Sequence, residues 1–176
     1  MAIVELVERV SRNPKCRVAA RNVAQPLDPT LSLPEDLKEF YDFCGGADLF
    51  LDEDYGFRIV SPSELKPATP EIHRILYAQN RATYDNDISA WWYFLGKSHG
   101  PEEGIVIDLH PERLGRCYDG YVGTYASTDC RVIALSFTEA LEWLLKAEGR
   151  ELFWDREDFP DLGHAYDGYE IEPPCG

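Results

Sequence analysis

An uninterrupted run of apolar residues, Trp91–Leu95, constrains the fold of this chain more than any other feature. A strand with one solvated face alternates apolar and polar residues, whereas a strand covered on both faces does not. The run ends at Gly96 and therefore predicts a central strand with packed layers on both sides. Because neighbouring strand residues point to opposite faces, at least one of Trp91 and Trp92 belongs to the core. The other either packs beneath a second layer of helices or anchors a binding partner.

A helix is predicted earlier in the chain, between two local signals. Ser32 and Glu35 have the spacing of a capping box, so we expect the helix to open there. Gly45 and Gly46 are expected to end it, because glycine accepts the left-handed conformation that follows many helices. The residues at helical spacing that predict its buried face are Leu37, Phe40, Tyr41 and Cys44.

A hairpin is predicted directly after the two glycines. Apolar residues alternate with others in Ala47–Leu51 and again in Phe57–Val60, which is typical of two strands. Three consecutive acids, Asp52, Glu53 and Asp54, lie at the tip between them. These acids are either a solvated turn, a cation site or part of a surface that faces a basic partner.

The remaining elements follow from the same patterns. Apolar spacing predicts a helix over residues 3–10 that ends at Asn13–Pro14, and Ser136 with Glu139 forms a second capping box for a helix that Gly149 closes. A further helix is predicted within 70–84, through Ile72, Ile75 and Leu76, and a short helical turn over 61–65. The other strands are expected at 105–109, 116–121 and 131–135.

The length and the cysteines place the chain among ordinary globular proteins. A chain of 176 residues buries enough surface for one stable domain without a disulfide or a metal. The chain contains no long apolar run, and its acidic and basic start is unlike a signal peptide, so we expect a cytoplasmic protein. An odd number of cysteines without a C-x-x-C pair predicts reduced thiols: Cys16, Cys44, Cys117, Cys130 and Cys175.

The charge is the most unusual part of the composition. The chain has 32 acidic and 17 basic residues, which gives a net charge of −15. Residues 1–25 carry a net charge of +3, whereas residues 148–176 carry −7. Such an excess repels nucleic acids and anionic lipids and attracts basic proteins at long range, although solubility alone can also explain it.

The order of these elements resembles the SUKH superfamily, the Smi/Knr-type domain. The resemblance covers about residues 1–148 and rests on order and separation more than on any one motif. The segments that carry it are Leu33–Phe40, Gly45–Gly46, the acidic hairpin, the aromatic strand and Ser136–Glu142. The long stretch Lys66–Ala90 and the segment after Gly149 depart from the shorter members.

The resemblance implies an α+β fold with a mainly antiparallel sheet and helices packed on it. We therefore expect a SUKH-like domain at residues 1–149 and an acidic extension at 150–176, whose aromatic residues favour docking on the domain. Many bacterial members of that superfamily are immunity proteins that bind a toxin, often a nuclease. Its fungal members are interaction proteins in cell-wall and signalling regulation.

The sequence offers little support for catalysis. The four histidines have no metal-binding spacing, the acidic turn lacks the pattern of an EF-hand, and no phosphate-binding or nucleophile motif occurs, so we expect no metal and no cofactor. Cys44 lies on the apolar face near a helix C-terminus, where a thiol is not activated. A small hydrolase that uses a pair of carboxylates stays open as an alternative, because any two acids can converge in space.

The leading hypothesis is a non-enzymatic immunity protein whose partner is a basic protein, specifically a toxin domain of the nuclease type. Its carboxylates would occupy the groove in which a nuclease holds phosphates. A housekeeping interaction scaffold of the same fold is the alternative. The residues predicted to bind the partner are Asp48, Asp52, Glu53, Asp54, Tyr55, Asp85, Asp87, Glu102 and Glu103.

Overall fold

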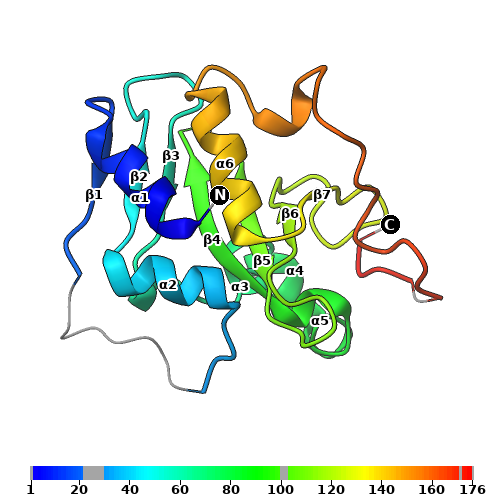
Figure 1. Ribbon diagram of the computed structural model, residues 1–176. Coiled ribbons are helices and arrows are strands. Elements are labelled where there is room, and N and C mark those ends of the chain that lie inside the picture. The colour runs from blue at the N-terminus through cyan, green and yellow to red at the C-terminus, as the bar shows by residue number, and fades with distance from the viewer. Residues whose placement is uncertain (1, 22–29, 100–102, 171, 176) are drawn as a thin grey trace.

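A seven-stranded antiparallel sheet forms the centre of the protein. The structure is a computed structural model, and it describes residues 2–21, 30–99, 103–170 and 172–175. Each strand pairs with its neighbours in sequence, so the spatial order is the chain order and β4 lies in the middle (Figure 1). This confirms the predicted α+β fold with an antiparallel sheet. The strands are β1 (Cys16–Val18), β2 (Ala47–Leu49), β3 (Phe57–Ile59), β4 (Trp92–Ser98), β5 (Gly104–Asp108), β6 (Cys117–Asp119) and β7 (Val132–Ala134).

Three helices cover one face of the sheet: α1 (Ile3–Arg12), α2 (Glu35–Phe43) and α6 (Phe137–Ala147). Figure 1 shows α1 and α6 lying across the sheet. Each helix turns an apolar stripe inward, as the 3.6-residue spacing predicts. Together with the inward residues of the strands they build the larger apolar cluster, which contains Leu6, Leu37, Phe40, Ile105 and Leu141.

The second face of the sheet carries a smaller cluster of apolar and aromatic residues. It is covered by α3 (Thr69–Ile72), α4 (Arg74–Gln79), α5 (Arg81–Asp85), the 3-10 helix η2 (Ile88–Trp91) and parts of the C-terminal segment. Trp92 is completely buried there against Tyr118 and Tyr125. The central strand is therefore covered on both faces. Trp91 lies in η2, before the strand, and its side chain is 47% exposed, with its ring against His110.

The predicted N-cap of α2 is wrong, whereas the helix does end just before the two glycines, although without the expected left-handed residue directly after it. The helix begins at Glu35 with Pro34 as its N-cap, and no side chain caps it, so Ser32 does not form the expected capping box. At the other end Cys44 is extended, and only Gly46 has a positive φ, of 119°. A β-carbon on Gly46 would lie 2.8 Å from the carbonyl oxygen of Ile59, so this glycine is needed where the chain enters the sheet.

The single helix predicted within residues 70–84 is three short helices, because the chain bends at His73 and again at Asn80. Its expected apolar stripe is not buried. Ile75 is 71% exposed and Leu76 43% exposed. The apolar residue that does pack is Ile72, which lies partly buried against the second cluster.

The last helix begins as predicted, since the Ser136 side chain accepts a hydrogen bond from the backbone N–H of Glu139. The Glu139 carboxylate accepts from the backbone N–H of Leu135 and not from that of Ser136, so the reciprocal half of the capping box is displaced by one residue. Glu148 and Gly149 both have positive φ and end the helix. Beyond them, Phe153 and Trp154 are buried in the larger cluster, and Tyr166 in the smaller one. None of the helices in the described parts of the chain is long and apolar enough to cross a membrane.

Candidate functional site

The acidic hairpin tip lies at the end of the sheet where the β2–β3 and β4–β5 turns meet. The backbone N–H of His99 donates to the carbonyl oxygen of Gly56, at 3.1 Å, which ties the two turns together. Asp52 and Asp54 are exposed, and Tyr55 is 38% exposed. These side chains can reach a partner without any rearrangement.

The hairpin tip has a fixed shape. Phe50 is buried with a positive φ of 52°, and its backbone N–H donates to the carbonyl oxygen of Lys15. The backbone N–H of Tyr55 donates to the carbonyl oxygen of Gly149, at 2.9 Å, so the tip rests on the C-terminal end of α6. A β-carbon on Gly149 would lie 2.7 Å from that of Phe50. The tip is therefore a packed turn.

Two of the predicted acids of the hairpin, Glu53 and Asp48, are bound by basic residues. Glu53 lies 2.5 Å from Lys15, and the hydrogen bond from this lysine lowers the pKa of Glu53. Asp48 lies 2.6 Å from Arg17 and 2.8 Å from Arg58. Burial alone would raise the pKa of Asp48, but the hydrogen bonds from the two arginines lower it below its usual value. The negative charge of Asp48 is thus neutralised by arginines of the two neighbouring strands.

Asp85 and Asp87 lie at the other end of the molecule, by α5, far from the hairpin tip (Figure 1). Asp85 is exposed and accepts hydrogen bonds from Tyr77 and Arg81. Asp87 is buried, and its Oδ1 accepts from the backbone N–H of Ser89 and from the hydroxyl of Tyr166, both at 2.8 Å. The prediction that Asp87 faces a partner is wrong, because its carboxylate anchors the C-terminal segment.

The nine predicted residues therefore do not form one continuous acidic face. Glu102 lies outside the described residues. Glu103 follows the β4–β5 turn, where its side chain accepts a hydrogen bond from Ser98, at 3.2 Å. The structure brings five of the nine to the same end of the sheet: Asp52, Glu53, Asp54, Tyr55 and Glu103.

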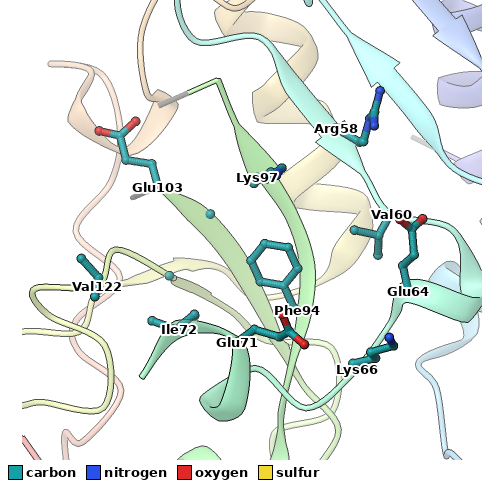
Figure 2. Close-up of a pocket in the computed structure, with 12 residues that line it drawn as sticks. Arg58, Val60, Glu64, Lys66, Glu71, Ile72, Phe94, Lys97, Glu103 and Val122 are labelled. Carbon is teal, nitrogen blue, oxygen red and sulfur yellow. The ribbon is translucent and has the colours of Figure 1, made fainter. Parts of the chain in front are cut away.

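A groove of about 540 Å³ opens beside Glu103 on the second face of the sheet (Figure 2). Its walls are β3, β4 and the segment that runs from the 3-10 helix η1 (Pro62–Glu64) into α3. The backbone N–H of Phe94 donates to the carbonyl oxygen of Lys66, so this segment takes the place of β3 beside the first half of β4. Sequence reasoning missed the groove, because none of its walls carries a recognisable motif.

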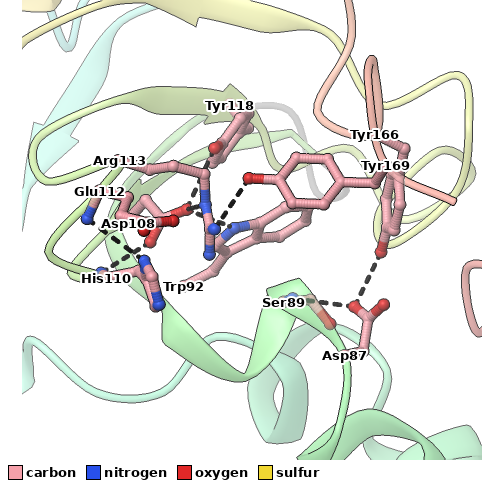
Figure 3. Close-up of polar contacts among 10 residues, drawn as sticks. All are labelled: Asp87, Ser89, Trp92, Asp108, His110, Glu112, Arg113, Tyr118, Tyr166 and Tyr169. Carbon is pink, nitrogen blue, oxygen red and sulfur yellow. Dashed lines mark hydrogen bonds and ion pairs between the residues drawn. The ribbon is translucent and has the colours of Figure 1, made fainter. Parts of the chain in front are cut away.

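A buried ion pair lies at the other end of β5. Asp108 is fully buried and lies 2.7 Å from Arg113. Its carboxylate also accepts hydrogen bonds from Trp92, Tyr118 and the backbone N–H of His110. Arg113 in turn donates to the hydroxyl of Tyr169, as Figure 3 shows. This network joins the sheet to the C-terminal segment, and its inward position indicates a structural role.

Groups with catalytic potential are scattered. Burial raises the pKa of Asp119 to about 6 and that of Cys44 to about 11, which disfavours a reactive thiolate at Cys44. His73 Nδ1 lies 3.0 Å from the Tyr84 hydroxyl and 3.6 Å from Cys175 Sγ, in a buried polar cluster. Across the described ranges, no three His, Cys, Asp or Glu side chains are placed to hold a metal ion.

Two comparisons with known proteins bear on the role of this fold. The family model of the SMI1 / KNR4 family (SUKH-1) matches residues 30–143. Immunity protein YokJ of Bacillus subtilis (strain 168) is 36% identical over 173 residues, which is 98% of this chain and 100% of that protein. The similarity to that protein therefore includes the segment after Gly149.

Proposed function

We propose, because this chain belongs to the SMI1 / KNR4 family (SUKH-1), that it is an immunity protein that binds and neutralises a toxin. The observation that carries the proposal is the 36% identity to Immunity protein YokJ along the whole of that protein. The fold contributes a rigid scaffold on which exposed side chains keep fixed positions.

In this proposal the protein acts by binding and not by catalysis, inside the cell that makes the toxin. The toxin domain is basic and of the nuclease type. A net charge of −15 attracts such a domain at long range, and the field is strongest where carboxylates are exposed and unpaired. Asp52 and Asp54 meet this description, since both are exposed and neither forms an ion pair within the described residues. We assign them the steering of the toxin.

Co-expression tests this function. A candidate toxin domain, sought among the proteins encoded beside this gene, is produced in a bacterial host with and without the chain. The proposal predicts that growth stops without the chain and is restored with it, and that the two proteins elute as one complex in size-exclusion chromatography. Continued growth arrest together with separate elution would refute it.

A second measurement addresses the carboxylate-dependent hydrolase. The purified chain is incubated with glycoside and ester substrates, with and without divalent metal ions. The proposal predicts no turnover, whereas turnover that a single carboxylate substitution abolishes would establish catalysis instead.

A further inference from the structure

The groove on the second face exists because two strands lack side chains at facing positions. Gly104 on β5 and Gly120 beyond β6 are hydrogen bonded to each other, at 2.9 Å, and both line the groove. The residue that pairs with Gly104 on β4 is Lys97, so a row across this face reads Lys97, Gly104, Gly120. The missing side chains leave one flank of the Phe94 ring uncovered (Figure 2).

The floor of the groove is apolar. Phe94 lies at its centre and is only partly buried, although it packs against both apolar clusters. Val60, Ile72 and Val122 line the groove around it. An apolar floor that the chain itself leaves partly uncovered gains free energy when a partner covers it.

The rim of the groove carries charges of both signs. Most Lys and Arg side chains in the described parts of the chain form ion pairs, yet Lys66 and Lys97 have no carboxylate oxygen within 4.0 Å among the described residues. Arg58 is bound to Asp48 and still 53% exposed. The charged residues of the rim are Arg58, Lys66, Lys97, Glu64, Glu71 and Glu103.

We propose that this groove is the docking site of the toxin, and that it takes a polypeptide segment with an apolar side chain flanked by charges of both signs. The inference rests on the proposed function and adds the contact surface to it. An apolar centre within a polar rim is the usual layout of a protein interface. Charge complementarity selects the occupant, because a segment of a single sign would meet like charges on one side of the rim.

The groove and the two exposed acids Asp52 and Asp54 affect different rate constants of toxin binding. Asp52 and Asp54 act at long range on the rate of association, whereas a desolvated groove acts mainly on the rate of dissociation. Glu103 is the predicted residue common to both regions, since it lies beside the two turns and also lines the groove. A toxin that arrives at the turns therefore reaches the groove without leaving the surface.

A pair of double variants tests the inference. Lys66→Glu with Lys97→Glu reverses two rim charges, and Arg12→Glu with Lys38→Glu makes the same change of net charge on exposed residues of α1 and α2. Binding of an inactive form of the toxin domain used in the co-expression test is measured by biolayer interferometry. We expect the rim variant to bind at least about tenfold more weakly and the control variant to stay within about threefold of the natural chain.

Hydrogen exchange locates the contact without any substitution. The inactive toxin domain is expected to slow exchange in residues 64–72 and 93–98 of the natural chain. If both double variants bind with equal affinity and the toxin domain slows hydrogen exchange only in other segments, the proposal that the toxin docks in the groove is wrong. The immunity function would still stand. Failure of the natural chain to bind or protect would instead refute the function itself. Tight binding of adenosine monophosphate in the groove, measured by calorimetry, would also overturn the inference, because it would identify a small ligand as the occupant.

Discussion

Two buried carboxylates, Asp108 and Asp119, have opposite electrostatic surroundings. Asp108 is paired with Arg113 and receives three further hydrogen bonds, so its charge is compensated inside the protein. The carboxylate of Asp119 accepts a hydrogen bond from the backbone N–H of Tyr121, at 3.0 Å, and within the described residues it has no ion-pair partner. An aspartate side chain therefore stabilises the fold at position 108 and destabilises it at position 119.

Replacing Asp108 by Asn is expected to destabilise the protein by about 3–5 kcal/mol, because the buried Arg113 guanidinium would lose its counter-ion. Urea denaturation measures the change in the free energy of unfolding. Glu112→Gln is the matched control, since Glu112 is exposed in the same loop, and we expect it to stay within about 0.5 kcal/mol. A cost below about 1 kcal/mol for Asp108→Asn would contradict the structural role of the ion pair.

Replacing Asp119 by Asn is expected to stabilise the protein at pH 7.5. Burial raises the pKa of Asp119 from 3.8 to about 6, so the folded state holds this proton more tightly than the unfolded state. The contribution of this group to stability therefore falls as the pH rises from about 4 to about 6, and the full loss persists above that range. Asn keeps an oxygen for the Tyr121 N–H and removes the charge, which corresponds to a gain of about 1–3 kcal/mol.

Denaturation curves between pH 4 and pH 8 check this expectation. The difference between Asp119→Asn and the natural chain should shrink as the pH falls towards 4. Asp129→Asn, at an exposed position beyond β6, should show no such trend. A variant that is less stable than the natural chain at pH 7.5 would show that the ionised carboxylate is compensated.

At the scale of elements, the C-terminal end of α6 and the acidic hairpin tip depend on each other. Gly149 has a φ of 71° and lies against Phe50 and Glu53, while Gly168 has a φ of 83° with nothing within 4 Å of its potential β-carbon. The two glycines have the same backbone requirement and differ only in crowding. Alanine substitutions at the two positions therefore separate the free-energy cost of a left-handed backbone from that of a steric overlap.

Gly168→Ala is expected to cost about 1 kcal/mol, which is the penalty of a left-handed conformation for a residue with a β-carbon. Gly149→Ala is expected to cost about 1–3 kcal/mol more, because its β-carbon would overlap the hairpin tip. Thermal and urea unfolding of the two variants measure the difference. Equal costs would show that the tip does not pack tightly on the end of α6.

The elements with strong local signals could be predicted from the sequence. The Trp91–Leu95 run placed the start of the central strand to within one residue, although the strand continues past Gly96 to Ser98. Ser136 placed the start of α6. The prediction of one helix within residues 70–84 was wrong. The apolar residues there have helical spacing whether or not they are buried, and the bend at His73 has no signal of its own in the sequence.

The site could be predicted less well than the fold. The acids of the hairpin tip are conspicuous in the sequence, yet nothing local reveals that Lys15 binds Glu53 or that Tyr166 buries Asp87. Both contacts join residues far apart in the chain. The groove depends on Gly104 and Gly120 facing each other across two strands, which only the register of the sheet determines.

At the scale of the whole molecule, the surplus of negative charge acts as a field more than as a single surface. Many carboxylates are paired with nearby bases, as Asp48 and Glu53 are. The exposed carboxylates without an ion pair among the described residues lie in separate segments, such as Asp52 in the hairpin tip and Glu112 in the loop after β5. Under the proposed function, this field would attract a basic toxin from any direction. The exposed turn then decides at which end the encounter is most favourable.

Reversing Asp52 and Asp54 to Lys is expected to slow association with the toxin domain by about tenfold at low salt and to flatten its salt dependence. Stopped-flow fluorescence over a series of salt concentrations measures both effects. Glu170→Lys with Glu172→Lys gives the same change in net charge within the C-terminal segment and should slow association less. Identical rates for the two double variants would show that net charge alone, without the turn, governs the encounter.

The facing glycines also bear on how such a protein can change over evolutionary time. A β-carbon at Gly104 would lie 2.8 Å from the carbonyl oxygen of Gly96, so a substitution there would disturb the sheet as well as fill the hollow. Selection for folding alone is therefore expected to retain this glycine and to keep the groove open, even in a relative that no longer meets its toxin. The lysines and glutamates of the rim make no such demand on the backbone, so under the proposed function they can change when the toxin changes.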